Sequence, residues 1–318
     1  MLDKYYFGKF GWEKYMGDNS YRVMVKKSGK KNAKPVLAVY SPITRGYAFI
    51  WGKDTLGQQL VDSGADVYLI DWGDDGISSN NGDNGAMDYV DRIKVVVEAI
   101  KAEYKVEQIN GFFLCASTVF AQLYFKQHKK DFKRVGMYDA LYYFNRDIGQ
   151  TYTIMFTEPV TKFVEKNFKE VSQYYVDYAF VLPSVSFFSL MYSNMKIVQE
   201  SGLAAYMDFL RLANDDRWIP SNFWKDALEY MDQDTQGDIE AGLAHSFKGV
   251  EAEIFNIVGD DDIIVKPSTS IIGLDAPEEL KKLVYKQKVL DTGHFCYARK
   301  CEEKTEEAKK EIAEWLAT

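Results

Sequence analysis

Three side chains in this sequence have the types and the chain order of a nucleophile, an acid and a base. Cys115 follows the apolar run 109–114 and precedes small residues, so its thiol is expected where a buried strand ends. Asp262 closes an acidic cluster after a later apolar run, and His294 follows the next such run. In such a set the thiolate attacks a carbonyl carbon, the histidine carries the proton, and the carboxylate orients the histidine. The three residues therefore predict nucleophilic catalysis.

Each of these residues also has a simpler interpretation. A single cysteine after an apolar run is often an inert buried thiol, and a single histidine is often structural. The other two histidines are weaker candidates for a base, because His128 lies in a lysine-rich helical segment and His245 in an aromatic-rich one. Both interpretations of Cys115 stay open at this point, but three reactive types in the right order favour the catalytic one.

The segments around these residues alternate between strand and helix. Continuous apolar runs predict buried strands at 36–42, 66–73, 109–115 and 134–140. Helical spacing of apolar residues predicts helices between them at 54–65, 86–104 and 118–130. Strand character returns at 251–259 and 282–290, and an amphipathic helix is expected at 302–318. This alternation predicts an α/β protein with a doubly wound, mostly parallel sheet.

Reactive or polar residues lie at the carboxyl ends of several of these strands. They are residues 41–44, residues 71–73, Cys115, Asp262 and His294. Ligands of doubly wound sheets bind outside the carboxyl ends of the strands. We therefore expect one functional site at this edge, and an acid followed by a histidine after two late strands is the order found in α/β-hydrolases.

The alternation stops in the middle of the chain. Residues 146–248 are rich in Tyr, Phe and Met, and short helices are expected there. The predicted organisation is a core of 1–145 and 249–318 with an inserted helical cap of 146–248. The aromatic residues have two interpretations, the core of the cap itself or an apolar wall over a site for an acyl chain or polymer.

The composition argues against several classes of function. The 318 residues carry a formal net charge of −8 with lysines scattered among acids, so no nucleic-acid partner is expected. No run approaches the roughly 18 apolar residues of a membrane-spanning helix, and the N-terminal residues do not resemble a signal peptide. The three cysteines have no zinc-ligand spacing, so neither a metal nor a disulfide framework is expected, and a cytoplasmic location is the simpler assumption.

The chain resembles the catalytic subunit of polyhydroxyalkanoate (polyester) synthases, particularly the short class III form that works with a second subunit. The resemblance covers most of the chain and is strongest at "VYSPITRGY", "DVYLIDWG", the Cys115 turn, "VGDDDIIVKPSTS", "TGHFCY" and the final "IAEWL". It implies the α/β-hydrolase fold with a cysteine in place of the hydrolase serine. Carried over residue by residue, the nucleophile is Cys115, the base is His294 and the acid is Asp262.

The resemblance also implies an activity. Cys115 would take the acyl group of an (R)-3-hydroxyacyl-CoA and release CoA, and His294 would then deprotonate the 3-hydroxyl of an incoming monomer or chain end. The expected oxyanion donors are the backbone N–H of Ala116 and the loop at Ile43. No cofactor is implied beyond the CoA thioester as substrate. The implied partners are the polyester chain and either a second synthase subunit or a second copy, at the surface of polyester granules.

The sequence departs from the family at the nucleophile. The family turn reads Gly-x-Cys-x-Gly-Gly, whereas this chain has Phe113, Ser117 and Thr118 at the three glycine positions. After the acid, Ile263 and Lys266 replace the family's histidine and proline. Two classes of function therefore stand side by side. One is an acyltransferase, or a relative that hydrolyses an acyl thioester or ester; the other is a non-catalytic homologue that binds polyester granules or a synthase partner.

Overall fold

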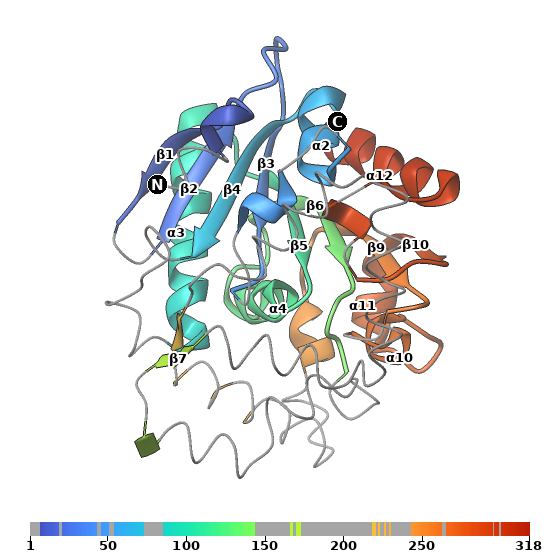
Figure 1. Ribbon diagram of the computed structural model, residues 1–318. Helices are drawn as coiled ribbons and strands as arrows, with labels where there is room; N and C mark the ends of the chain where they lie inside the picture. The colour runs from blue at the N-terminus through green and yellow to red at the C-terminus, as the bar shows by residue number, and fades with distance from the viewer. Residues whose placement is uncertain are drawn as a thin grey trace.

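The computed structural model describes residues 7–18, 21–42, 46–50, 54–72, 85–143, 243–262, 265–294, 296–298 and 300–318, with a few short pieces between 166 and 229. These residues build a central sheet of eight strands with helices on its two sides (Figure 1). No described helix has the length and apolar character needed to cross a membrane.

The sheet is mixed at one edge and parallel over the rest. In spatial order its strands are β1 (Glu13–Gly17), β2 (Tyr21–Lys26), β4 (Asp66–Trp72), β3 (Pro35–Val39), β5 (Ile109–Leu114), β6 (Phe132–Tyr138), β9 (Glu253–Gly259) and β10 (Val284–Leu290). Strand β2 is antiparallel to both of its neighbours, and every pair from β4 to β10 is parallel. The carboxyl ends of the parallel strands therefore meet at a single edge.

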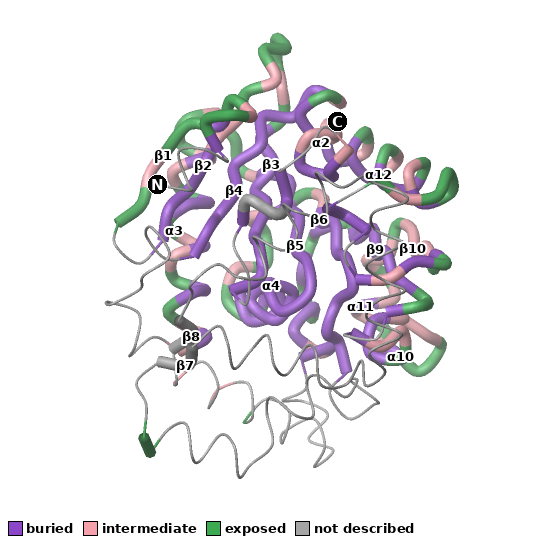
Figure 2. Tube along the Cα trace, viewed as in Figure 1, coloured by how far each residue is buried: buried purple, intermediate pink, exposed green. Residues whose placement is uncertain are grey.

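The helices cover the sheet in two groups. They are α2 (Leu56–Ser63), α3 (Ala86–Tyr104), α4 (Ser117–Gln127), α10 (Pro267–Ser270), α11 (Glu278–Leu283) and α12 (Glu303–Leu316), with single 3-10 turns η1 (Gly46–Phe49), η2 (Leu243–Phe247) and η3 (Cys296–Ala298). Helix α12 packs against α2, and α3 packs against α4 (Figure 1). Because helices lie on both of its faces, the sheet has buried strands in its interior (Figure 2).

Local sequence signals explain most of these elements. Strands β3, β4 and β5 are buried over their whole length, as the continuous apolar runs predict. Helix α2 begins after Thr55, whose side chain accepts a hydrogen bond from the backbone of Gln58, and ends at Gly64 with φ = 107°. The predicted α/β architecture is thus confirmed.

The N-terminal strands were not predicted. The residues of β1 are exposed or only half-buried, so this segment has no apolar run. It forms a strand because its backbone pairs with β2, which in turn pairs with β4. An exposed edge strand such as β1 is defined by its backbone pairing with a neighbour, and the local sequence pattern does not reveal it.

Most of the predicted cap at 146–248 lies outside the described residues. Two of its short pieces, β7 (Glu170–Ser172) and β8 (Trp218–Pro220), pair as antiparallel strands, which the expectation of helices did not include. The turn η2 packs its Phe247 against Phe125 of α4, with ring centroids 5.5 Å apart. The helical cap as a whole remains a prediction.

Candidate active site

Cys115 occupies a tight turn between β5 and α4. Its backbone has φ = 51°, a left-handed conformation that costs a residue with a side chain about 1–2 kcal/mol. The backbone N–H of Cys115 donates to the carbonyl of Tyr138, 2.9 Å away, which ties the turn to the end of β6. A strained strand-to-helix turn of this kind places a nucleophile at the edge of the sheet. Cys115 thus lies between a strand and a helix, as the sequence predicted, with its side chain buried, and its role as a nucleophile stays a prediction.

Two hydroxyl groups that follow Cys115 stabilise this turn by hydrogen bonds. The Ser117 hydroxyl accepts from the backbone N–H of Leu114 at 2.9 Å and lies 2.7 Å from the carbonyl of Val39, to which it donates. The Thr118 hydroxyl donates to the carbonyl of Cys115 at 2.6 Å. Ser117 and Thr118 are fully buried, so these bonds satisfy polar groups that water cannot reach.

Phe113 fits beside the turn because Gly111, on the same strand, has no side chain. Its ring packs edge-on against Phe132, with centroids 5.7 Å apart. Gly111 lies two residues earlier on the same face of β5, where a Cβ atom would stand 2.7 Å from the ring of Phe132 and 3.0 Å from that of Phe113. The missing side chain at Gly111 therefore leaves room for the rings of Phe113 and Phe132.

Asp262 and His294 lie together at the same edge of the sheet. His294 Nδ1 is 2.6 Å from Asp262 Oδ2, and the other carboxylate oxygen of Asp262 accepts from the backbone N–H of Val265 at 3.0 Å. Asp262 is 1% exposed and His294 is 7% exposed. The carboxylate therefore fixes the orientation of the imidazole in a place where water competes little.

The imidazole is also hydrogen-bonded to Cys115. Burial works to lower the pKa of His294, but the charge and hydrogen bonds of Asp262 and Cys115 outweigh it, so the pKa lies well above its ordinary value. A raised histidine pKa favours the imidazolium, and an imidazolium beside a thiol favours the thiolate. The three residues predicted from the sequence thus form one connected chain of side chains, able to activate a sulfur nucleophile.

A fourth side chain, Asp139, was missed by the sequence reasoning. It follows β6 with φ = 46°, is fully buried, and places Oδ2 3.5 Å from His294 Nδ1. Its Oδ1 accepts from the backbone N–H of Gly259 at 2.7 Å. Burial and the charge of Asp262 raise the pKa of Asp139 well above its ordinary value, against the opposing effect of His294. The available signal was an acid directly after the strand "RVGMY", the neighbour of the nucleophile strand.

Of the two expected oxyanion donors, Ala116 lies among the described residues and Ile43 does not. Ala116 directly follows Cys115 and directly precedes α4; it is 4% exposed, and its backbone N–H finds no acceptor among the described residues. A buried N–H at a helix N-terminus suits a developing negative charge. Ile43 lies outside the described residues, so its predicted role stays a prediction.

Gly46, at the start of the 3-10 turn η1 that follows β3 in the chain, is bonded to Asp71. Asp71 Oδ1 accepts from the backbone N–H of Gly46 at 2.6 Å, and Oδ2 pairs with the Arg22 guanidinium at 2.7 Å. A Cβ atom at Gly46 would stand 3.1 Å from Asp71, so the close approach requires glycine or a shift. The acid of the "DVYLIDWG" motif therefore links the turn η1 to strand β2.

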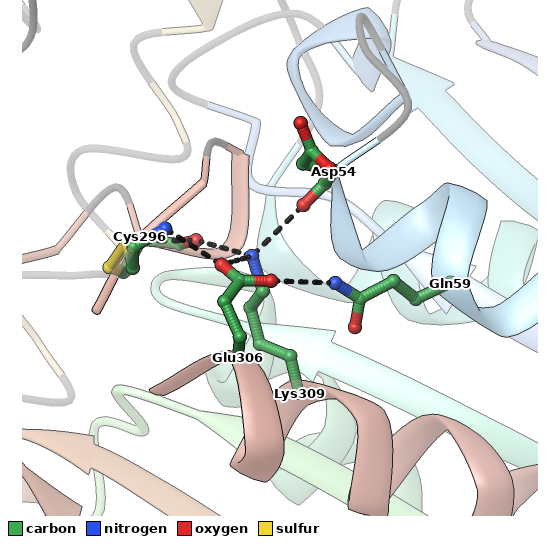
Figure 3. The surroundings of a disulfide bond; sticks show 6 residues. Asp54, Gln59, Cys296, Glu306 and Lys309 are labelled. Atoms are coloured by element: carbon green, nitrogen blue, oxygen red, sulfur yellow. Dashed lines mark hydrogen bonds and ion pairs between the residues drawn. A yellow bond between two sulfur atoms is a disulfide. The ribbon is translucent and has the colours of Figure 1, made fainter. Parts of the chain in front are cut away.

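A disulfide bond closes the segment directly after His294, contrary to the expectation that no cysteines are paired. Cys296 and Cys301 are joined, with Cα atoms 6.0 Å apart. Buried Lys309 of α12 donates to the carbonyls of Cys296 at 3.3 Å and Asp54 at 2.9 Å, and it pairs with Glu306 (Figure 3). The spacing of five residues between the two cysteines does not by itself predict a disulfide. Helix α12 contacts both ends of the segment, because Lys309 donates to the carbonyl of Cys296 and Glu306 accepts from the backbone N–H of Cys301.

Solved structures of hydrolytic enzymes are similar to this chain. A monoacylglycerol lipase of Paleococcus ferrophilus has a TM-score of 0.61 and 16% identity, covering 96% of this chain and 98% of its own. A carboxylesterase structure from the thaumarchaeon Nitrososphaera gargenis has a TM-score of 0.55 and 14% identity, with 96% and 98% covered. The thioesterase domain from the curacin biosynthetic pathway has a TM-score of 0.54 and 11% identity, with 97% and 100% covered.

No protein-family model matches the sequence, and no curated protein matches it. The identities with the solved structures are low, so these similarities show the fold alone. The eight-stranded sheet, in which β2 is antiparallel to β1 and β4 and the strands from β4 to β10 are parallel, and the strained strand-to-helix turn at Cys115 agree with them. This chain has the α/β-hydrolase fold.

Proposed function

We propose that this protein is a cysteine-dependent enzyme that cleaves a carboxylic ester or thioester through an acyl group bound to Cys115. The observation that carries the proposal is the continuous hydrogen-bonded chain from Cys115 through His294 to Asp262. Such a chain is the working part of a nucleophilic acyl-transfer site. The similar structures, which include a lipase, a carboxylesterase and a thioesterase domain, support the same class of reaction.

The proposed reaction has two halves. His294 uses Nδ1 to donate to Asp262, which leaves Nε2 to take the proton of the Cys115 thiol. The thiolate forms a bond to the acyl carbon, and the bond from that carbon to the leaving oxygen or sulfur breaks as His294 returns the proton to the leaving group. In the second half His294 removes a proton from an incoming water or alcohol, which attacks the thioester and restores the thiol.

Two features would stabilise the charge that develops in each half. The Ala116 N–H lies beside the nucleophile at the N-terminus of α4, where it can donate to the oxyanion. One such donor is worth about 3 kcal/mol of transition-state stabilisation. Asp262 stabilises the imidazolium that forms when His294 accepts the proton.

A second candidate is transfer of the acyl group to a hydroxyl, which would extend a polyester from 3-hydroxyacyl-CoA. The observation that favours it is the cysteine itself, together with the synthase-like segments around Cys115, Asp262 and His294. Exchange of a CoA thioester for the Cys115 thioester is nearly balanced in energy, and conversion of a thioester to an ester is downhill. The polyester chain, a second synthase subunit or a second copy, and a place at granule surfaces belong to this candidate.

The nature of the acceptor can be tested directly. Purified protein is incubated with p-nitrophenyl butyrate, butyryl-CoA and 3-hydroxybutyryl-CoA, and nitrophenol, free CoA, free acid and polymer are followed separately. We expect release of nitrophenol or CoA with free acid as the product, and none of either with Cys115→Ala. Polymer in place of free acid would favour the second candidate.

The non-catalytic alternative has its own test, because Cys115 is the one cysteine of the chain that lies outside the disulfide. The rate of alkylation by iodoacetamide is measured against pH for the wild type and for His294→Ala. We expect the wild type to react at acidic pH at a rate that the variant reaches only at alkaline pH. Equal rates in the two proteins, with no turnover of any substrate, would leave a binding protein as the better description.

A further inference from the structure

Two carboxyl groups, and not one, converge on the imidazole of the proposed site. Asp262 Oδ2 lies 2.6 Å and Asp139 Oδ2 lies 3.5 Å from the same atom, His294 Nδ1. Both aspartates follow neighbouring parallel strands, β6 and β9, at their carboxyl ends. Neither carboxyl side chain is exposed. One hydrogen on Nδ1 can satisfy only one acceptor fully, so the second carboxyl needs a separate explanation.

The position of Asp139 is held on several sides. Its backbone N–H donates to the carbonyl of Ile257 at 2.9 Å, and its Oδ1 accepts from the backbone of Gly259 at 2.7 Å. A Cβ atom at Gly259 would lie 3.5 Å from both Asp139 Oδ1 and Asp262 Cβ. Asp139 has, like Cys115, a left-handed backbone, a strained conformation that occurs preferentially at functional sites. The strand that leads to Asp262 therefore also aims the carboxyl of Asp139.

The charges of the cluster require a proton between the two acids. Asp139 Oδ2 has no hydrogen-bond partner among the described residues while both carboxyls are ionised, because two carboxylate oxygens are both acceptors. The titratable groups that act on Asp139 are Asp262 after β9 and His294 after β10, with Cys115 after β5 on the imidazole's other bond. Cys115 and His294 share one proton, so this pair is neutral overall whether it is thiol and imidazole or thiolate and imidazolium. The carboxylate of Asp262 then gives the buried cluster one negative charge, and an ionised Asp139 would add a second, uncompensated one. A proton on Asp139 removes this charge and supplies a donor to Asp262.

On this basis, and given the proposed function, we propose that Asp139 is a second acid partner of His294. In the resting enzyme Asp139 is protonated and donates to Asp262, which holds the imidazole. When the negative charge of Asp262 is removed, as in the variant Asp262→Asn, Asp139 releases its proton to solvent. Its carboxylate then accepts the hydrogen bond from His294 Nδ1. Asp139 is thus a positioning residue that acts through His294.

The variant Asp262→Asn is the first test. In a triad with one acid, replacing that acid by its amide lowers turnover by about 10⁴-fold. With Asp139 as a reserve acid, we expect a loss of about 10²-fold or less, and a rate that rises with pH as Asp139 ionises. The same rise is expected in the alkylation rate of Cys115. A loss as large as for a single acid, with an alkylation profile from pH 5 to pH 8 that coincides with that of His294→Ala, would overturn the proposal.

The double variant Asp139→Asn/Asp262→Asn is the second test. We expect it to lose the remaining activity and the pH dependence that Asp262→Asn retains, so that Asp139→Asn costs at least about tenfold more in the Asp262→Asn background than in the wild type. A purely structural role of Asp139 would lower the melting temperature equally in both backgrounds and leave the pH profile of Asp262→Asn unmoved. If the double variant does not fold, the profile of the single variant Asp262→Asn alone decides.

A metal ion is the other occupant that these atoms admit, because the ligand atoms of Asp139, Asp262 and His294 all lie within 4.8 Å of one another. Elemental analysis of the purified wild type, with and without added Zn²⁺, separates the two. We expect no stoichiometric zinc; one equivalent that Asp139→Asn removes would overturn the shared proton. The alkylation measurements need no substrate, so a wild type without turnover would count against the proposed function and not against this one.

Discussion

The Nδ1 atom of His294 lies 2.6 Å from Oδ2 of Asp262, although the two residues follow different strands. The contact exists because β9 and β10 are parallel neighbours that end at the same edge of the sheet. Cys115 arrives at this edge from β5, and Asp139 arrives from β6 between them. The parallel sheet, more than any single loop, therefore assembles the candidate site.

The hydroxyl of Ser117 should contribute to the stability of the folded protein. Ser117→Ala leaves the backbone N–H of Leu114 and the carbonyl of Val39 without their partner in a fully buried place. We expect the free energy of unfolding to fall by about 1–3 kcal/mol, measured by urea denaturation. Ser63→Ala, at a half-buried position in α2, is the matched control and should change it little. Wild-type stability in Ser117→Ala would show that these bonds do not hold the turn.

Removing the carboxylate of Asp71 should affect both stability and turnover. Asp71→Ala breaks a buried ion pair with Arg22, which typically costs about 3–5 kcal/mol, and frees the backbone of Gly46. We therefore expect a lower melting temperature and a lower kcat, with the loss of kcat also present at temperatures where the variant is fully folded. Lys130→Ala, which removes an exposed ion pair with Glu251, should leave both nearly unchanged. A normal kcat in the folded Asp71→Ala variant would show that Asp71 contributes to stability and not to turnover.

The buried proton of Asp139 should make stability depend on pH. Between the ordinary value of 3.8 and its raised pKa, Asp139 binds a proton in the folded protein but not in the unfolded chain. The free energy of unfolding therefore falls as the pH rises through this range. Asp139→Asn removes the titrating group, so its stability relative to the wild type should increase with pH, measured by urea denaturation from pH 4 to pH 9.

The control for this pH series is Asp260→Asn, because Asp260 is exposed in the same loop as Asp262. Its stability should follow that of the wild type at every pH. A constant difference between Asp139→Asn and the wild type would mean that Asp139 has the same protonation in both states.

The disulfide between Cys296 and Cys301 should contribute modestly to stability. It closes a segment of only about six residues, for which the loss of chain entropy in the unfolded state corresponds to about 2 kcal/mol. We expect Cys301→Ser to lower the free energy of unfolding by about this amount, and dithiothreitol to do the same to the wild type. Dithiothreitol should not lower the free energy of unfolding of Cys301→Ser any further. An additional decrease in this variant would show that dithiothreitol acts on something other than the disulfide.

Much of the fold was predictable because its signals are local. Apolar runs identified the buried strands β3, β4 and β5, and helical spacing identified α3 with its buried residues Val90, Ile93, Val97 and Ile100. The order of Cys115, Asp262 and His294 pointed to one edge of the sheet, and the structure brings these side chains together there. Whether they act as a catalytic triad remains a proposal.

The sequence by itself determined the buried parallel strands, the helices between them and the reactive residues that follow these strands, because the periodicity of apolar residues is a property of each segment alone. Only the tertiary structure decided that Asp139 faces His294, that Ser117 bonds to Val39, and that Gly111 makes room for Phe113. These relationships join residues on different strands or compensate across a packed face. They depend on strand order, register and side-chain volume, which no local pattern contains.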